Sequence, residues 1–182
     1  YKITDCSGNS TTVTQTINVA DITGPAISSI PANVTVSCAG LVPPANTSAV
    51  VASDNCGGPV TVTSTDVTVA GICVNRFTVN RTYKVTDCSG NSSSATQVIT
   101  VNDQTGPVMT PPATQTLNVG AGAGCTVSMP DYRSQVTATD ACGGVVTIQQ
   151  LAPNTPGSSV LGYGGTRTIT FMGTDVCGNT ST

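Results

Sequence analysis

The sequence predicts an all-β protein made of tandem immunoglobulin-like β-sandwich units stapled by disulfides, and three observations support this prediction. The 182 residues include 32 Thr and 24 Val, but only 4 Leu and no Glu. β-Branched residues favour strands, whereas Leu and Glu favour helices. A ten-residue pattern also occurs three times along the chain, and short alternating runs of apolar and polar residues follow one another at the spacing of a two-sheet sandwich.

The repeated pattern is a strand followed by a turn that carries a cysteine. It reads YKVTDCSGNS at 83–92, YKITDCSGNS at 1–10 and, with more changes, FMGTDVCGNT at 171–180. The first two copies start 82 residues apart and the last two 88 residues apart, which is the size of a small domain. We therefore expect three parts: the C-terminal hairpin of a preceding repeat over 1–20, a complete repeat over 22–103, and a second repeat over 104–182 that lacks its last strand.

Residues 1–20 are expected to form a strand through Tyr1 and Ile3, a Ser-Gly-Asn turn, and a second strand over 15–19. The segments DITGP at 21–25 and DQTGP at 103–107 then mark the domain junctions, because Gly-Pro interrupts a strand. Such short junctions cannot act as long flexible tethers. Neighbouring units should therefore hold a restricted angle.

The 22–103 unit is expected to contain about seven short strands. Its first strand is broken at Pro31, and Cys73 lies in an irregular stretch that follows one or two strands between 60 and 69. The strand through 83–86 and a last strand over 97–101 complete the unit. The 104–182 unit should follow the same plan, since the turn at 140–144 (DACGG) matches the turn at 54–58 (DNCGG).

Eight cysteines without close C-x-x-C pairs and without any histidine indicate disulfides rather than a metal centre, and hence an oxidising, extracellular location. Four cysteines allow three connectivities, and the expected strand order selects among them. The loops carrying Cys56 and Cys88 lie at one end of such a sandwich, as do those carrying Cys142 and Cys177. We therefore predict the bonds Cys56–Cys88 and Cys142–Cys177, with Cys38–Cys73 by elimination, and leave Cys6 and Cys125 unpaired.

Disulfides are physically expected because a β unit of this size with few aromatic residues has a thin core. Each bond should contribute roughly 3 to 4 kcal/mol through loop-closure entropy. The net stability of a domain is of the same order. On this connectivity, reduction should unfold the 22–103 unit.

A D-x-T-G-P segment, a D-N-C-G turn and a T-D-x-S-G-N turn before a final Q-x-I-x-V strand together resemble the hyalin repeat, and especially the cysteine-rich version found in tandem in giant surface adhesins of gliding bacteria. The resemblance covers 22–103 along its whole length and the flanking parts as fragments. The matching residues are Asp21, Thr23, Pro25, Asp54, Cys56, Gly57, Asp87, Cys88, Gly90 and Asn91.

The resemblance implies an extracellular, adhesive or structural protein, exported by the type IX route in the gliding bacteria. It also implies a partner for Cys125, because in the general hyalin repeat a cysteine after a Gly-rich stretch pairs with one in the last strand. That strand would begin just beyond Thr182. The third part lacks a counterpart of Cys73, which is a departure from the second part.

We expect no catalysis. The absence of histidine excludes Ser-His-Asp and Cys-His arrangements, and acid–base work would depend on nine Asp. Most of these Asp lie in repeated turns or junctions, where the carboxylate bonds nearby backbone N–H groups. No cofactor is expected, apart from Ca²⁺ as an alternative use of Asp21, Asp54, Asp87 and Asp103, whose hard oxygens could stiffen a junction.

The expected partners are neighbouring repeats, identical chains in a fibre, and surface glycans or other cells contacted through parts outside this sequence. A net charge of −3 without a basic stripe argues against nucleic acid, and no apolar run is long enough to span a membrane. The function expected is a structural or adhesive segment of a surface filament or adhesin stalk. The alternatives are a calcium-stiffened adhesion array and a spacer or carbohydrate-binding module of a secreted enzyme, for which Tyr132 and Tyr163 are the spare aromatic residues.

Overall fold

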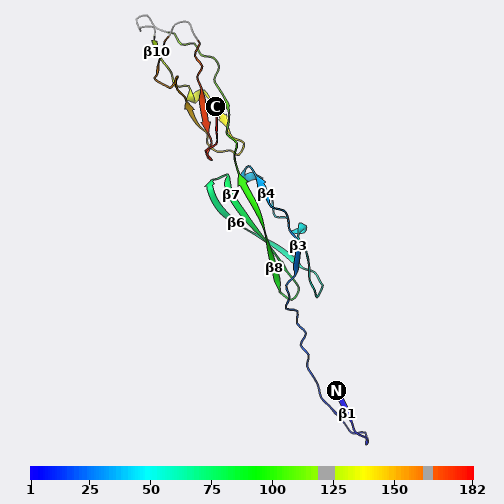
Figure 1. Ribbon diagram of the computed structural model, residues 1–182. Coiled ribbons are helices and arrows are strands. Elements are labelled where there is room, and N and C mark those ends of the chain that lie inside the picture. Colours follow the sequence, from blue (N-terminus) through cyan, green and yellow to red (C-terminus); the bar gives the residue numbers. More distant parts are fainter. Residues whose placement is uncertain (119–125, 162–165) are drawn as a thin grey trace.

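The computed structural model describes residues 1–118, 126–161 and 166–182, so Cys125 and Tyr163 lie outside the described residues. The chain is elongated, with an N-terminal hairpin, a central unit (22–103) and a C-terminal unit (104–182) following one another along its long axis (Figure 1). Within the described residues, the regular structure consists of β-strands and three short 3-10 turns, η1 (Ala39–Leu41), η2 (Thr47–Ala49) and η3 (Arg133–Gln135). The all-β prediction is confirmed.

The N-terminal hairpin is shorter than predicted. Strand β1 (Lys2–Thr4) pairs with β2 (Ser10–Thr12), and the predicted strand over 15–19 does not form. The N–H of Val13 already donates to the carbonyl of Tyr1, 2.9 Å away, so the residues after Val13 have no residue opposite them. A strand requires a partner for its backbone groups, and the residues beyond Val13 are exposed as a result.

The central unit contains two sheets. One has the order β4 (Val34–Val36), β8 (Ser92–Asn102), β7 (Arg76–Thr86) and β6 (Thr61–Cys73), with β4 parallel to β8 and the other pairs antiparallel. The other sheet pairs β3 (Ala26–Ser29) with β5 (Val51–Ser53). The break predicted at Pro31 is therefore the point where the first strand passes from one sheet to the other, as in immunoglobulin-like sandwiches.

Strand β6 differs from the prediction. It runs without interruption from Thr61 to Cys73, and Cys73 is its last residue instead of lying in an irregular stretch. The register shifts between Val69 and Cys73, which marks a bulge near the end of the β6–β7 hairpin. This hairpin carries Cys73 to the tip of the central unit.

The core of the central unit lies on one face of β7 and β8. Val79, Tyr83 and Val85 alternate along β7, Ile99 and Val101 lie opposite on β8, and none is more than 5% exposed. This follows from the alternation of side chains along a strand. Arg81 occupies the same face, and there its guanidinium binds the Asp66 carboxylate through two contacts of 2.8 Å.

The C-terminal unit pairs its strands in a similar way. The sheet β9–β11 corresponds to β3–β5, and the sheet β12–β14–β15 corresponds to β6–β7–β8. A third pair joins β10 to β13. The buried residues Met129, Tyr132, Val136 and Phe171 form its core. The strands are β9 (Val108–Thr110), β10 (Thr126–Ser128), β11 (Thr137–Thr139), β12 (Thr147–Gln150), β13 (Ser159–Leu161), β14 (Phe171–Thr174) and β15 (Thr180–Ser181).

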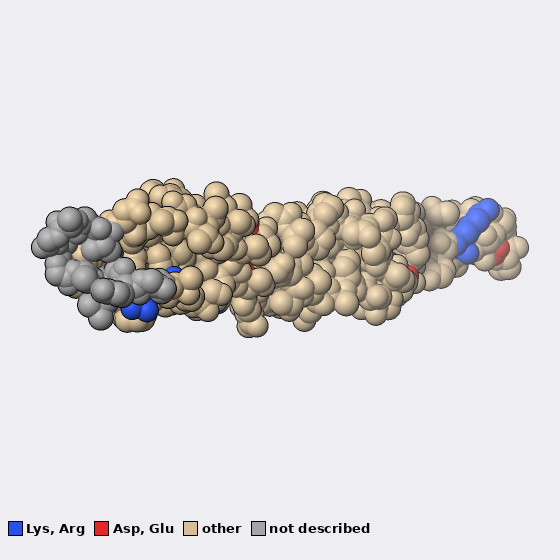
Figure 2. All heavy atoms as spheres, turned by 90° about the horizontal axis from the view of Figure 1, so that it is seen from above, with Lys and Arg blue, Asp and Glu red and all other residues tan. Residues whose placement is uncertain are grey.

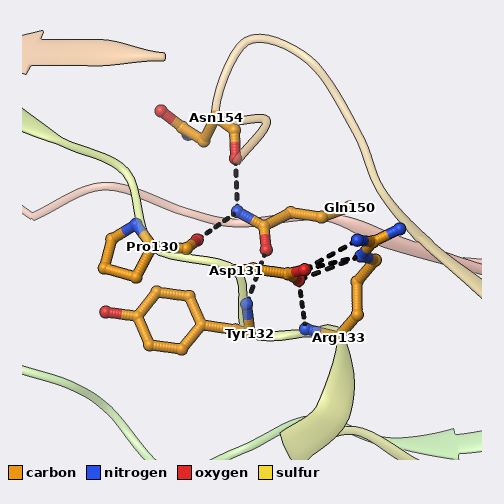
Figure 3. A network of polar contacts seen from close by, with 6 residues as sticks. All are labelled: Pro130, Asp131, Tyr132, Arg133, Gln150 and Asn154. Atoms are coloured by element: carbon orange, nitrogen blue, oxygen red, sulfur yellow. Dashed lines mark hydrogen bonds and ion pairs between the residues drawn. The ribbon is translucent and has the colours of Figure 1, made fainter. Parts of the chain in front are cut away.

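The buried side chain of Gln150 connects the loops around this core (Figure 3). Its amide nitrogen donates to the carbonyls of Pro130 (3.1 Å) and Asn154 (2.6 Å), and its amide oxygen accepts from the backbone N–H of Tyr132 (3.0 Å). A buried amide is stable only when such partners are present. Gln150 therefore holds Tyr132 in the core.

The surface carries few charges. The face in Figure 2 is almost entirely uncharged, with Lys and Arg visible only towards the two ends of the molecule. A nucleic-acid-binding surface requires clustered basic residues, which this face lacks. In the part of the chain that the structure describes, no helix is long and apolar enough to cross a membrane.

Candidate functional site

The three copies of the repeated turn are built around an Asp. In the central unit, Asp87 Oδ1 accepts from the backbone N–H groups of Ser89 (2.9 Å) and Asn91 (2.8 Å), and Oδ2 accepts from the Asn91 side chain (2.9 Å). Burial by itself would raise the pKa of Asp87, but these hydrogen bonds together lower it. Asp5 and Asp175 have the same contacts and lowered pKa values. These carboxylates stabilise turns, as predicted from their residue type.

Each junction segment docks on the Asn of such a turn. The side chain of Asn91 donates to the carbonyl of Asp21 (3.2 Å), and that of Asn179 donates to the carbonyl of Asp103 (3.3 Å). The Gly of D-x-T-G-P permits this approach: a Cβ at Gly106 would lie 2.5 Å from the carbonyl oxygen of Thr180. The two sequence motifs are therefore parts of one contact.

Two disulfides join the central unit to the C-terminal unit. Cys38–Cys142 and Cys73–Cys177 have Cα–Cα distances of 5.0 Å and 5.2 Å, within the ordinary range for disulfides. Each bond connects residues 104 positions apart. The junction between the two units is thus covalent at two points, and we treat it as the candidate functional site.

The predicted pairs Cys38–Cys73, Cys56–Cys88 and Cys142–Cys177 are wrong. The prediction assumed that cysteines at one end of a sandwich bond to each other. The tip carrying Cys38 and Cys73 instead abuts the end of the C-terminal unit, so bonds form across the junction. Cys56 and Cys88 are exposed free thiols in the corresponding turns of the central unit, and Cys6 is also free.

Polar contacts surround the two bonds. The buried Asn75 accepts an N–H from Ala39 (2.9 Å) and donates to the carbonyl of Cys142 (3.4 Å). The neighbouring Arg76 donates to the carbonyl of Asp103 (2.7 Å) and to the side chain of Asn179. The roles of Asn75 and Arg76 could not be predicted from the sequence, because a polar pair in a hairpin turn carries no signal of the unit that it will contact.

Two Asp clusters lie at equivalent positions of the two units. Carboxylate oxygens of Asp103 and Asp140 and the sulfur of Cys142 all lie within 4.8 Å of one another, and Asp21, Asp54 and Cys56 form the same arrangement. These are the described residues that could hold a metal ion. Of the predicted calcium candidates, Asp87 belongs to neither cluster, and Asp140 is an addition that its match to Asp54 in the repeated turn could have revealed.

The Cys56 thiol is affected by its acidic neighbours. Desolvation raises its pKa, and the charges of the nearby carboxylates of Asp21, Asp54 and Asp87 raise it further. Only the thiolate is nucleophilic. Cys56 is therefore a weak nucleophile at neutral pH despite its exposure.

Replacing Asp21 by Asn is expected to speed alkylation of Cys56 severalfold at pH 8, because the loss of the nearby negative charge lowers the thiol pKa. Labelling with iodoacetamide followed by peptide mass spectrometry measures the rate. Cys6 lies in the separate hairpin and serves as the internal control. An unchanged ratio of the Cys56 rate to the Cys6 rate would show that Asp21 does not raise the pKa of the Cys56 thiol.

One of the two tyrosines expected to serve sugar binding, Tyr132, is buried. Tyr132 is 6% exposed and packs in the core of the C-terminal unit with Phe171, so its ring has no free face. Its backbone N–H is held by Gln150, which explains why a residue in a loop becomes buried. Tyr163 lies outside the described residues.

The fold and the junction define a class of protein: an all-β, disulfide-stapled sandwich of the immunoglobulin type. Residues 26–101 match the family described as "HYR-like domain with 4 cysteines". The four cysteines in that range are Cys38, Cys56, Cys73 and Cys88. A comparison with the curated proteins finds no match. The central unit is thus similar to a hyalin-repeat-like domain, and this similarity suggests an extracellular module of the adhesion type.

Proposed function

We propose that this chain is a load-bearing segment of a cell-surface filament or adhesin stalk, in which tandem hyalin-type repeats are covalently joined end to end. One observation carries the proposal: both disulfides cross the same junction between successive units. The elongated shape and the weakly charged surface agree with a structural role (Figures 1 and 2). Adhesion itself, to glycans or to other cells, would be performed by other parts of such a protein.

The two disulfides create two covalent paths that transmit a pulling force between Cys38 and Cys177 once the chain is unfolded. From Cys38, one path follows the main chain to Cys73 and then crosses the Cys73–Cys177 disulfide. The other path crosses the Cys38–Cys142 disulfide and then follows the main chain to Cys177. The segment 74–141 belongs to neither path. It contains β7 and β8, the strands that form the core of the central unit. Force on the unfolded chain would therefore bypass most of the sequence between the bonds.

Single-molecule pulling on the two ends tests the proposal. The oxidised chain is expected to reach a final length shorter than that of the reduced chain by about 100 residues, or roughly 350 Å at about 3.5 Å per extended residue. The missing extension should appear in the same molecule when a reductant is added. Equal final lengths with and without the reductant would show that the junction bonds do not carry the load.

A further inference from the structure

The cluster at the junction contains carboxylate oxygens without a hydrogen-bond partner. Asp103 is 1% exposed, and its Oδ2 is buried and accepts no hydrogen bond. The same is true of Oδ2 of Asp140. Their Oδ1 atoms are occupied, since Asp103 accepts from the N–H of Thr105 (3.1 Å) and Asp140 from the N–H of Cys142 (2.8 Å).

Buried anionic oxygens in this state are costly. A carboxylate removed from water requires a compensating charge or hydrogen bonds, and two that approach each other add mutual repulsion. Arg76 does not supply the compensation, because it donates to the main-chain carbonyl of Asp103 and to the side chain of Asn179. No hydrogen-bond donor or cation among the described residues therefore contacts the two free oxygens.

The same arrangement occurs at the other end of the central unit. Oδ2 of Asp21 and Oδ1 of Asp54 are buried and without partners, while their other oxygens accept from the N–H groups of Thr23 (3.0 Å) and Cys56 (2.9 Å). These four atoms are the only buried side-chain polar atoms without partners found in the described part of the chain. Asp87, by contrast, uses both oxygens within its own turn.

From these contacts we infer that Asp103 with Asp140, and Asp21 with Asp54, each bind a Ca²⁺ ion. In the junction cluster the sulfur of Cys142 is bonded to Cys38 and carries no charge, so the donors that remain there are hard carboxylate oxygens. Such oxygens select Ca²⁺ over transition metals, and waters and main-chain carbonyls complete its coordination. Two carboxylates per ion correspond to a weak site, with a Kd of about 10⁻⁴ to 10⁻³ M as in extracellular modules.

The ion would fasten the junction beside the disulfides. Asp103 begins the segment that leaves the central unit, and Asp140 begins the turn that carries Cys142. Binding therefore ties the connecting segment to the first disulfide. This role adds to the proposed load-bearing function and does not depend on it.

Titration of the oxidised, chelator-treated full chain with Ca²⁺, followed by amide NMR, tests the inference. The amide signals of Thr105 and Cys142, and those of Thr23 and Cys56, are expected to shift saturably, because their N–H groups bond the ligand carboxylates. In Asp140→Asn the first pair of signals should require at least tenfold more Ca²⁺, while the second pair should respond as in the unaltered chain.

The matched control is Asp131→Asn, which removes one exposed carboxylate from the same unit and should leave all four responses unchanged. Thermal unfolding gives a second readout. Without Ca²⁺, Asp140→Asn should melt at or above the temperature of the unaltered chain, because repulsion is relieved. With Ca²⁺ the order should reverse. Absence of shifts at the four amides, equal shifts in Asp140→Asn, or an equal response to Mg²⁺ would overturn the inference.

Discussion

Breaking the two junction disulfides is expected to uncouple the two units without unfolding the central one. The central unit contains no internal disulfide, and its core of Tyr83, Val85, Ile99 and Val101 is independent of the cysteines. This result is the opposite of the one expected from pairing within the unit. Closing a loop of about 100 residues stabilises a chain by roughly 4 to 5 kcal/mol. Loss of the bonds should therefore separate one cooperative transition into two.

The variant that tests this carries Ser at Cys38, Cys73, Cys142 and Cys177. Denaturant unfolding should show two transitions, and small-angle scattering should show a broader distribution of end-to-end distances. The control carries Ser at Cys56 and Cys88, which are free thiols, and should behave as the unaltered chain. A single transition with an unchanged midpoint in the fourfold variant would mean that noncovalent contacts alone fix the junction.

Replacing Tyr83 by Ala is expected to destabilise the central unit by about 3 to 5 kcal/mol, as for other large buried aromatic residues. Its ring is fully buried, its hydroxyl donates to Gln97 (3.3 Å), and the same oxygen accepts from the N–H of Asn46 (3.4 Å). A loss of this size is a large fraction of the roughly 5 to 15 kcal/mol that stabilises a domain. Guanidinium unfolding followed by circular dichroism measures it.

Two controls separate packing from hydrogen bonding. Tyr83→Phe keeps the ring but removes both hydrogen bonds, and should cost roughly 1 to 2 kcal/mol, since one hydrogen bond contributes about 0.5 to 1.5 kcal/mol. Tyr1→Ala alters the residue at the same position of the repeated pattern, but Tyr1 is 82% exposed, and the change should cost less than about 0.5 kcal/mol. A similar loss for Tyr1 and Tyr83 would contradict the assignment of the core.

The strand positions could be predicted because they depend on local pattern. Alternation marked the strands through 83–86 and 97–101, which belong to β7 and β8, Pro31 marked the break in the first strand, and Asp and Gly marked the turns. The prediction of a strand over 15–19 was wrong because local pattern alone does not form a strand. Its alternation is as good as that of β8, but a strand also requires an opposing backbone, which residues beyond Val13 lack.

The cysteine pairing could not be predicted, because a disulfide depends on distances that local pattern does not contain. Composition and repetition predicted that the chain is all-β, that some of its cysteines form disulfides, and that two similar units follow one another. Only the tertiary structure decided that Cys38 and Cys73 meet Cys142 and Cys177 across the junction, and that Asp103 faces Asp140. Strand formation is governed by neighbours along the chain, whereas these contacts arise from how one finished unit docks on the next.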